Sequence, residues 1–342
     1  MLFRSPGRAV DLDVANRELQ QRLREQHAER ERKPLLHIAG ARANREPLAY
    51  DALAAPAFSG SRLVEPSLSE LIPYVDWQFF FHAWELKGKY PAILEQPAAR
   101  ELYDDALALL DEIVRDGSLE ARGVYGFWPA RADGDDVELG DETRFHFLRQ
   151  QNAYGDSRPN RCLADYVAPK GDHLGGFAVA IHGAETLSTR YEAENDDYKS
   201  IMVKALADRL AEAFAERQHA VARREWYEDG AELSTADLVA ERYRGIRPAF
   251  GYPACPDHSE KPALFTLLGA GRAGLELTES NAMLPAAAVS GVYFGHPSSR
   301  YFSVGRIGRD QVEDYAVRKG IALGEAERWL RPNLGYEPAD RS

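Results

Sequence analysis

The run of residues 247–258, RPAFGYPACPDH, restricts the fold more than any other part of this chain. Its prolines break a regular helix and cannot donate to the hydrogen-bond ladder of a sheet. Gly251 permits backbone angles, or a close approach of a ligand, that a side chain would block. Arg247 carries a planar fork of donors that matches a carboxylate or a phosphate. The run therefore predicts a stiff, irregular loop with an anion-binding arginine, and loops of this kind often carry function.

Length and composition exclude several classes of protein. A chain of 342 residues can form one large domain or two small ones, and its 44% hydrophobic and 28% charged residues are typical of a globular protein. The net charge of −12 argues against a general binder of nucleic acids or anionic membranes. Cys162 and Cys255 are too few for a disulfide framework or a four-cysteine zinc site, and no apolar run could span a bilayer. These features predict a reduced, cytoplasmic setting.

Hydrophobic periodicity predicts a mixture of helices and strands. Residues 34–70, with scattered proline and glycine, predict an extended strap. Helices are expected at 12–33, 98–117, 194–227, 257–268 and 309–330, and strands at 123–130, from 137 onward, at 174–181, 275–280, 291–294 and 301–305. Because these elements do not alternate as regular βαβ units, an α+β fold is favoured over a doubly wound one.

The longest predicted helix, residues 194–227, has an apolar side and a charged side. Lys204, Asp208, Glu212 and Glu216 fall together on the charged side. Spacing alone predicts that this side is simply solvated.

The glycine-rich run 269–274, GAGRAG, matches the dinucleotide-binding pattern by letter. That chemistry needs a strand before the glycines and a helix after them. Here the order is reversed, so the run predicts a helix end and a turn. The chain has no phosphate-binding P-loop, and no histidine pairs with cysteine at zinc spacing, so no metal site is expected.

Two aromatic segments leave alternatives open. In residues 74–84, YVDWQFFFHAW, either the whole segment is a core strand or helix, or Asp76 is held by the rings and aimed at a ligand. Tyr301 and Phe302 are either core residues of a strand or ring faces for a ligand. As strand neighbours they would lie on opposite faces, so at most one would face a given pocket. Together with Arg247, these residues suit a ligand that is both charged and aromatic.

Arg247 with Gly251-Tyr252 and the following PACP resembles the signature of the activation domain of cobalamin-dependent methionine synthase. Phe250 stands where similar proteins often have proline, which is expected to relax the loop slightly. The resemblance extends over residues 34–337, in blocks at 76–91, 162–170, 196–216, 247–261, 277–297, 309–315 and 329–336.

The resemblance implies a single C-shaped α+β domain with a twisted antiparallel sheet flanked by helices. This domain would span residues 34–342, after a charged helical linker at 1–33. Residues that match the S-adenosylmethionine site of similar proteins are Asp76, Arg247, Ala249, Gly251, Tyr252, Tyr301 and Phe302, with Glu212 and Glu241 nearby. Asp208 and His258 match positions that dock the partner module.

The resemblance also implies the function: reactivation of methionine synthase, in methionine biosynthesis, by reductive methylation of cob(II)alamin. S-adenosylmethionine would give the methyl group and a flavodoxin-type donor the electron. The chain lacks the Asp-x-His-x-x-Gly motif for cobalamin, so a partner module must carry it. No catalytic acid, base or nucleophile is expected. Two alternatives stay open: a docking module that binds no ligand, and a stand-alone S-adenosylmethionine-dependent methyltransferase.

Overall fold

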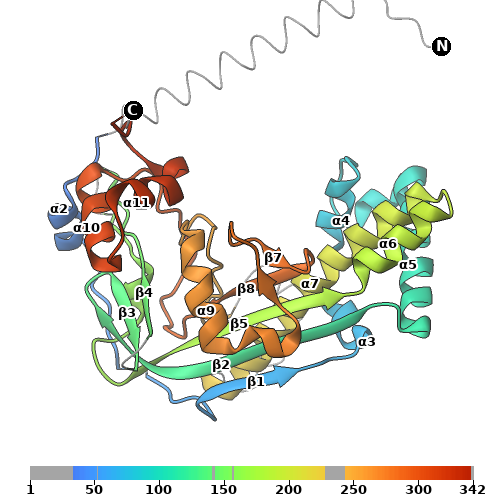
Figure 1. Ribbon diagram of the computed structural model, residues 1–342, viewed down its shortest axis with the longest axis horizontal. Coiled ribbons are helices and arrows are strands. Elements are labelled where there is room, and N and C mark those ends of the chain that lie inside the picture. Colours follow the sequence, from blue (N-terminus) through green and yellow to red (C-terminus); the bar gives the residue numbers. More distant parts are fainter. Residues whose placement is uncertain (1–33, 52, 141–142, 156–157, 228–242, 340–342) are drawn as a thin grey trace, which may run out of the picture. The chain divides into compact units, whose positions relative to one another are not determined.

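The computed structural model describes residues 34–339, except 52, 141–142, 156–157 and 228–242 (Figure 1). The linker helix predicted at 1–33 and the predicted site residue Glu241 therefore lie outside the described residues. The chain divides into two compact units. The larger contains residues 46–148 and 161–303, and the smaller contains residues 1–45, 149–160 and 304–342.

The larger unit is built on one antiparallel sheet, curled into a half-barrel (Figure 1). Its strands, in spatial order, are β4 (Thr143–His146), β3 (Asp136–Leu139), β2 (Glu120–Asp133), β5 (Asp172–His182) and β8 (Ala288–Tyr293), with β1 (Gly60–Val64) also paired to β2. The two longest strands, β2 and β5, pair from Glu120↔His182 to Ala130↔Asp172. The predicted α+β class, with a twisted antiparallel sheet flanked by helices, is confirmed.

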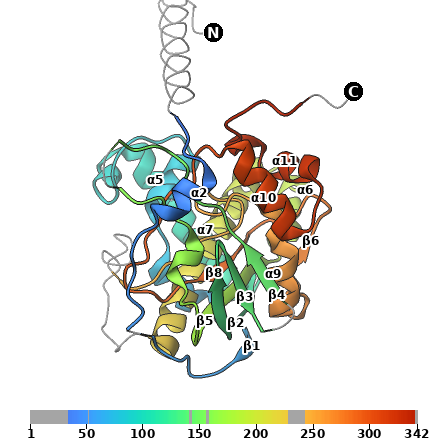
Figure 2. The same ribbon diagram turned by 90° about the vertical axis from the view of Figure 1, so that its left-hand side faces the viewer.

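Helices cover both faces of this sheet (Figure 2). The helices of the larger unit are α3 (Leu68–Leu71), α4 (Trp77–Ala83), α5 (Pro97–Asp116), α6 (Ala184–Ala193), α7 (Asp197–Trp226) and α9 (Lys261–Leu268). Tyr125 and Phe177 point into the core shared with α5 and α7. Their strand neighbours Val124 and Ala178 point into the core shared with α9. This burial on both faces explains why residues 123–130 of β2 and 174–181 of β5 form apolar runs.

The predicted helix at 98–117 is confirmed as α5, and Gly117 ends it in the left-handed conformation. Residues 269–274 also behave as predicted: α9 ends at Gly269, and a single 3₁₀ turn, not a helix, follows.

Four predictions of local structure were wrong. Residues from 137 onward form two strands, β3 and β4, because Gly140, with φ of 59°, turns the chain between them. Residues 301–305 form no strand, and the strand predicted at 275–280 is only β6 (Glu276–Leu277), paired with β7 (Met283–Leu284). Residues 34–70 are not a continuous strap, since they contain α2 (Ile38–Ala43), β1 and α3. The helix α6 was not predicted, since the helix expected at 194–227 begins after it ends.

The smaller unit consists of α2, α10 (Arg309–Lys319) and α11 (Leu323–Trp329) around a buried polar network. The Gln311 side chain accepts a hydrogen bond from the Arg149 amide and donates one to the Arg149 carbonyl, at 2.7 and 2.9 Å. The Gln311 side chain thus satisfies both backbone hydrogen-bonding groups of Arg149, as a neighbouring strand would, and connects α10 to the segment 149–160. None of the described helices combines the length and apolarity needed to cross a bilayer.

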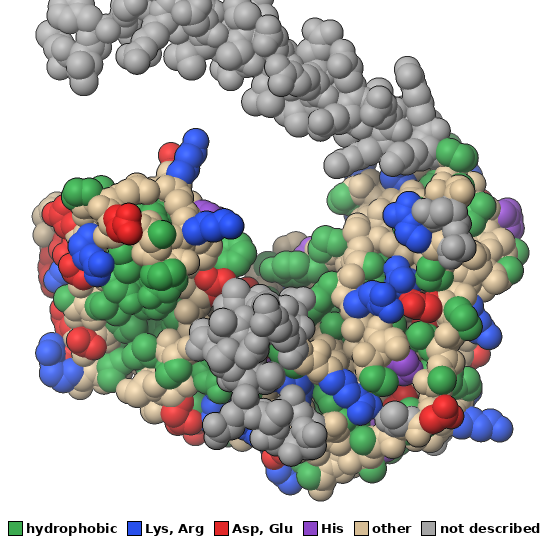
Figure 3. Space-filling model, turned by 180° about the vertical axis from the view of Figure 1, so that it is seen from behind, with side chains coloured by type: hydrophobic (Ala, Val, Ile, Leu, Met, Phe, Trp, Pro, Cys, Tyr) green, Lys and Arg blue, Asp and Glu red, His purple; other side chains and the backbone are tan. Residues whose placement is uncertain are grey.

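Acidic and basic side chains are interspersed over the face of the protein shown in Figure 3. They do not gather there into one basic patch of the kind that tracks a nucleic-acid backbone.

Candidate functional site

Arg247 lies on a short extended segment held against the edge strand β8. Ile246 pairs antiparallel with Phe294, and the Val292 amide donates to the Pro248 carbonyl at 3.0 Å. Because successive side chains of an extended segment point to opposite sides, Ile246 enters the core while Arg247 points away from it. The Arg247 amide donates to the Tyr301 hydroxyl at 3.0 Å. The segment thus brings Arg247 and Tyr301 together, as the sequence predicted for a shared site.

Among the described residues, the Arg247 guanidinium contacts one carboxylate, that of Glu216. Its Nη2 donates to Oε2 of Glu216, on α7, at 2.5 Å, and the Arg247 side chain keeps 20% of its exposure. Burial alone would lower the pKa of Arg247, but the Glu216 carboxylate and the nearby Tyr301 outweigh it and raise that pKa above its usual value. Arg247 is therefore a permanent cation. Because one edge of its guanidinium stays accessible, it can also bind an anion from outside the protein.

The loop after Arg247 is irregular, as predicted, and is closed by hydrogen bonds within it. The Gly251 amide donates to the Cys255 carbonyl at 2.8 Å, and the Tyr252 amide donates to the Ala249 carbonyl at 3.2 Å. The Cys255 thiol donates to the same Ala249 carbonyl at 3.0 Å. These bonds close a compact turn and leave the Tyr252 side chain 61% exposed.

Phe250 anchors this turn in the core. Its ring is 1% exposed and stacks on Phe147, with 6.1 Å between the ring centroids and 18° between the planes. Phe145 packs against it from β4. The ring thus gives the turn buried apolar contact.

Gly251 is needed in this turn for two physical reasons. Its φ of +96° strains any other residue, and a Cβ added there would lie 2.1 Å from Cε1 of His258. We therefore expect Gly251→Ala to lower the free energy of unfolding by about 2 kcal/mol, measured by urea denaturation. Adding His258→Ala to that variant removes the collision but keeps the backbone strain, so it should restore part of the loss. A Gly251→Ala variant as stable as wild type would contradict this account.

Asp76 begins helix α4, so the aromatic segment 74–84 contains a helix and not a strand. The Asp76 carboxylate accepts from the Gln78 amide at 2.9 Å and caps α4, while Phe80 and Phe81 enter the core. Helix α4 packs against α7, where Arg209 lies over the Phe79 ring. No hydrogen bond or ion pair between described residues joins Asp76 to Arg247. The two flank the same helix without touching.

The remaining predicted residues are placed as follows. Tyr301 is 38% exposed, whereas Phe302 packs against the core shared with α9, so at most one of the two faces a ligand. Asp208 lies exposed on α7, and Glu212 is half-buried one turn further on. The exposed His258 packs its ring under Gly251.

The prediction that one whole side of α7 is solvated was wrong for its later half. Lys204 and Asp208 are exposed, but Glu216 keeps only 13% of its side-chain exposure because Arg247 covers it. The periodicity could not reveal this, since the covering arginine comes from a segment about thirty residues away in the sequence.

A buried group of polar and aromatic side chains behind Arg247 was missed entirely. His219 of α7 stacks on Tyr293 of β8, with ring centroids 5.2 Å apart and planes 5° apart. Tyr293 stacks in turn on Phe177 of β5, with centroids 4.8 Å apart. The only sequence signal was a set of polar residues on α7 at helical spacing, Glu216, His219 and Arg223, which are all turned toward the sheet.

Burial, helped by the nearby cations Arg247 and Arg223, holds the pKa of His219 well below its usual value. The other charged or titratable neighbours are the rings of Tyr293 and Tyr243. The unfolded chain binds a proton at this histidine below about pH 6.5, while the folded protein does not, so stability falls with decreasing pH.

We expect His219 to contribute about 1.4 kcal/mol per pH unit to the loss of stability below pH 6.5. Urea unfolding of wild type and His219→Gln from pH 7.5 to 5.5 measures this contribution. The variant should show the shallower slope, whatever its stability at pH 7.5. Equal slopes would show that His219 takes up its proton in the folded protein.

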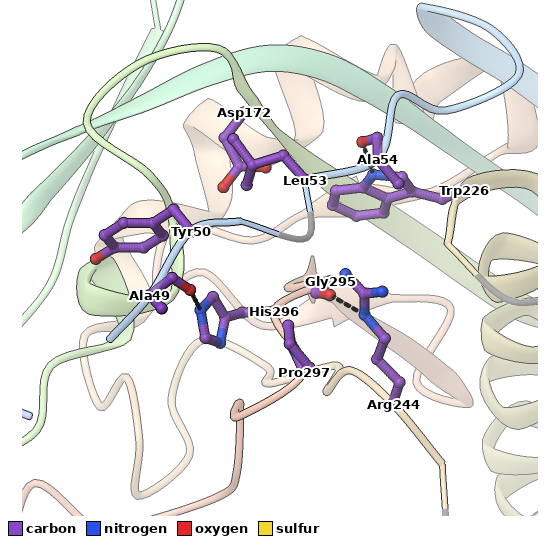
Figure 4. A pocket seen from close by; sticks show the side chains of 10 residues that line it. All are labelled: Ala49, Tyr50, Leu53, Ala54, Asp172, Trp226, Arg244, Gly295, His296 and Pro297. Atoms are coloured by element: carbon purple, nitrogen blue, oxygen red, sulfur yellow. Dashed lines mark hydrogen bonds between the residues drawn. The ribbon is translucent and has the colours of Figure 1, made fainter. Parts of the chain in front are cut away.

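A small pocket of the larger unit lies where the 49–54 segment meets Trp226 and residues 295–297 (Figure 4). Its rim is closed by hydrogen bonds from His296 to the Ala49 carbonyl and from Arg244 to the Gly295 carbonyl, at 3.0 and 2.7 Å. The volume of about 10 Å³ holds no more than one water molecule. This pocket is too small for a nucleoside and does not include Arg247.

Two comparisons relate this geometry to known proteins. The family model for the vitamin B12-dependent methionine synthase activation domain matches residues 67–320. Among solved structures, the MetH reactivation domain bound to AdoHcy is 46% identical in sequence to this chain and superposes with a TM-score of 0.85. That match covers 89% of this chain and 100% of the solved one. The family match includes the strands from β2 to β8, α7 and the Arg247 loop.

Proposed function

The chain belongs to the family of vitamin B12-dependent methionine synthase activation domains, and from this premise we propose that it binds S-adenosylmethionine for reactivation of the synthase. In this proposal the chain presents the methyl group to cob(II)alamin held by a partner cobalamin module. A flavodoxin-type protein supplies the electron. The setting is cytoplasmic, and the chain acts as a component of a methyltransferase.

The single observation that carries the proposal is the state of Arg247. Its Nε is buried without a partner, and its Nη1 makes no hydrogen bond with any residue that the structure describes. An arginine that keeps unused donors at an accessible edge fits a ligand carboxylate. The solved relative with AdoHcy supports an S-adenosyl amino acid as that ligand.

We assign the predicted residues to parts of this ligand. Arg247 holds the carboxylate, and Asp76 faces the ammonium or the ribose hydroxyls. The Ala249–Tyr252 turn and Tyr301 line the adenosine, with Phe302, Glu212 and Glu241 as weaker assignments. Asp208 and His258 are proposed contacts to the partner module.

When bound, S-adenosylmethionine supplies an electrophilic methyl group. The residues of this chain bind and orient the ligand and exclude water, and none of them needs to move a proton. The expected absence of a catalytic acid or base is part of this proposal.

Equilibrium binding tests the proposal. We expect S-adenosylmethionine and S-adenosylhomocysteine to bind the wild-type chain. ATP serves as the negative control and should not bind. The chain should then transfer a labelled methyl group to cob(II)alamin on a separate cobalamin module, in the presence of reduced flavodoxin. Absence of binding, together with retained affinity for that module, would support the alternative of a docking module.

A further inference from the structure

Glu216 is the part of the Arg247 site that the family resemblance leaves without a role. It lies on α7 with its side chain turned toward the sheet, and its carboxylate lies between two arginines. Oε2 accepts from Nη2 of Arg247 at 2.5 Å, and Oε1 lies 4.0 Å from Nη1 of Arg223. A carboxylate held in this way is stabilised on both sides by positive charge.

The contact leaves one edge of the Arg247 guanidinium open to a ligand. Nε and Nη2 form the side-on edge of an arginine, and Nη1 with Nη2 forms the end-on edge. Glu216 accepts a hydrogen bond from Nη2, which belongs to both edges, while Nε and Oε1 are buried and make no hydrogen bond. Because Nε is buried, a ligand carboxylate can reach the guanidinium only at the end-on edge, where Nη1 makes no hydrogen bond with a described residue.

We propose that Glu216 is a positioning residue that fixes the guanidinium of Arg247 so that its end-on edge faces the ligand carboxylate. This inference rests on the proposed function. A free arginine side chain has considerable rotamer entropy, which binding must otherwise remove. Because the Glu216 pair already orders Arg247 when the chain folds, this cost no longer falls on ligand binding.

The same geometry explains how two carboxylates share one guanidinium. In this proposal the ligand carboxylate binds at Nη1 while Glu216 stays at Nη2, and Arg223 places a second cation beside Glu216. The ligand carboxylate therefore binds a cation that is already oriented. Arg223 offsets part of the repulsion from Glu216. Glu216 thus makes binding depend on a carboxylate in the ligand, which distinguishes S-adenosyl amino acids from other adenosine compounds.

The test compares two ligands that differ in this one group: S-adenosylmethionine and its decarboxylated form. For the wild-type chain we expect a ratio of dissociation constants of about 100 in favour of S-adenosylmethionine. In Glu216→Gln the ratio should fall to about 10, with little change for the decarboxylated ligand. In Arg247→Ala the ratio should be near 1, and adding Glu216→Gln to it should change the ratio no further.

Glu225→Gln is the matched control. Glu225 lies on the same helix, and its partly buried carboxylate contacts Tyr125 and Arg62 instead of Arg247. Its substitution should leave the ligand ratio unchanged. If Glu216→Gln does not fold, by circular dichroism, Glu216→Asp keeps the charge but withdraws it by one methylene, and should give an intermediate ratio.

The possible outcomes separate this inference from the proposed function. If wild type binds neither ligand, the proposed function fails, and this inference with it. If wild type discriminates but Glu216→Gln keeps the full ratio, only the positioning role is overturned. An equal loss of affinity for both ligands would also overturn it, since it would show a purely structural role.

Discussion

Replacing Arg247 by alanine is expected to weaken the binding of S-adenosylmethionine on the order of 100-fold, or about 3 kcal/mol, in calorimetric titrations. The substitution removes the arginine of the 247–258 loop, whose guanidinium is partly accessible. Among the described residues, this loop contains no other arginine or lysine. Removal of one partner from a mostly desolvated ion pair has a large effect because the other charge, here the ligand carboxylate, is left without a counter-charge. Undiminished affinity in the variant would remove the central claim about this site.

The same substitution should also affect folding, and the two effects can be separated. Without Arg247, the Glu216 carboxylate is left largely buried, which we expect to lower the free energy of unfolding by about 3 kcal/mol. The double variant Arg247→Ala/Glu216→Gln removes that unpaired charge. It should recover much of the stability and none of the affinity. If the double variant recovered affinity as well, the loss in the single variant would have come from misfolding.

Arg247→Lys is the conservative control. Lysine keeps the positive charge for Glu216 but lacks the planar fork, so it cannot present two donors to a second carboxylate. We expect near-normal stability with an affinity loss of about 10-fold. A lysine variant that bound as tightly as wild type would show that charge alone, and not the fork, recognises the ligand.

The long elements were predictable from the sequence because their signals are local. The helix α5 has its apolar stripe and its terminating Gly117, and the strands β2 and β5 are apolar runs of the length that a buried strand needs. The dinucleotide-binding interpretation of residues 269–274 was rejected because a helix precedes the glycines and none follows them. The structure has the same order of elements. Local signals of this kind survive because tertiary packing reinforces them.

The polar side of the site was not predictable in the same way. Spacing placed Glu216 on a solvated face, because periodicity records which residues share a side of α7 but not what covers that side. The extent of β3 and β4, and the absence of a strand at 301–305, likewise depend on turns and partners distant in the chain. Arg247 itself was identified because its motif, and not its environment, carries the resemblance.

Gly291→Ala is expected to be strongly destabilising, because it forces apart the segment that carries Arg247 and the strand β8. A Cβ at Gly291 would lie 2.5 Å from the Pro248 carbonyl oxygen and 3.0 Å from Cε1 of Phe177. The first neighbour is backbone and the second is a fully buried ring, so neither can move aside easily. The segment that carries Arg247 must therefore separate from β8.

That separation has two measurable consequences. Loss of the Val292–Pro248 hydrogen bond and overpacking beside Phe177 should lower the free energy of unfolding by about 3 kcal/mol. The displaced Arg247 should lose its alignment with Glu216, so we expect affinity for S-adenosylmethionine to fall by about 10-fold or more in the protein that remains folded.

Gly271→Ala is the control for the Gly291 variant, because a Cβ there meets no atom within 4 Å and the backbone φ is not left-handed. It should unfold at the wild-type urea concentration and bind S-adenosylmethionine normally. If Gly291→Ala behaved like Gly271→Ala in both measurements, the 246–248 segment would not need its close contact with β8. Arg247 would then have to be held by Glu216 and Tyr301 alone, and the effect of Glu216→Gln on binding should be correspondingly larger.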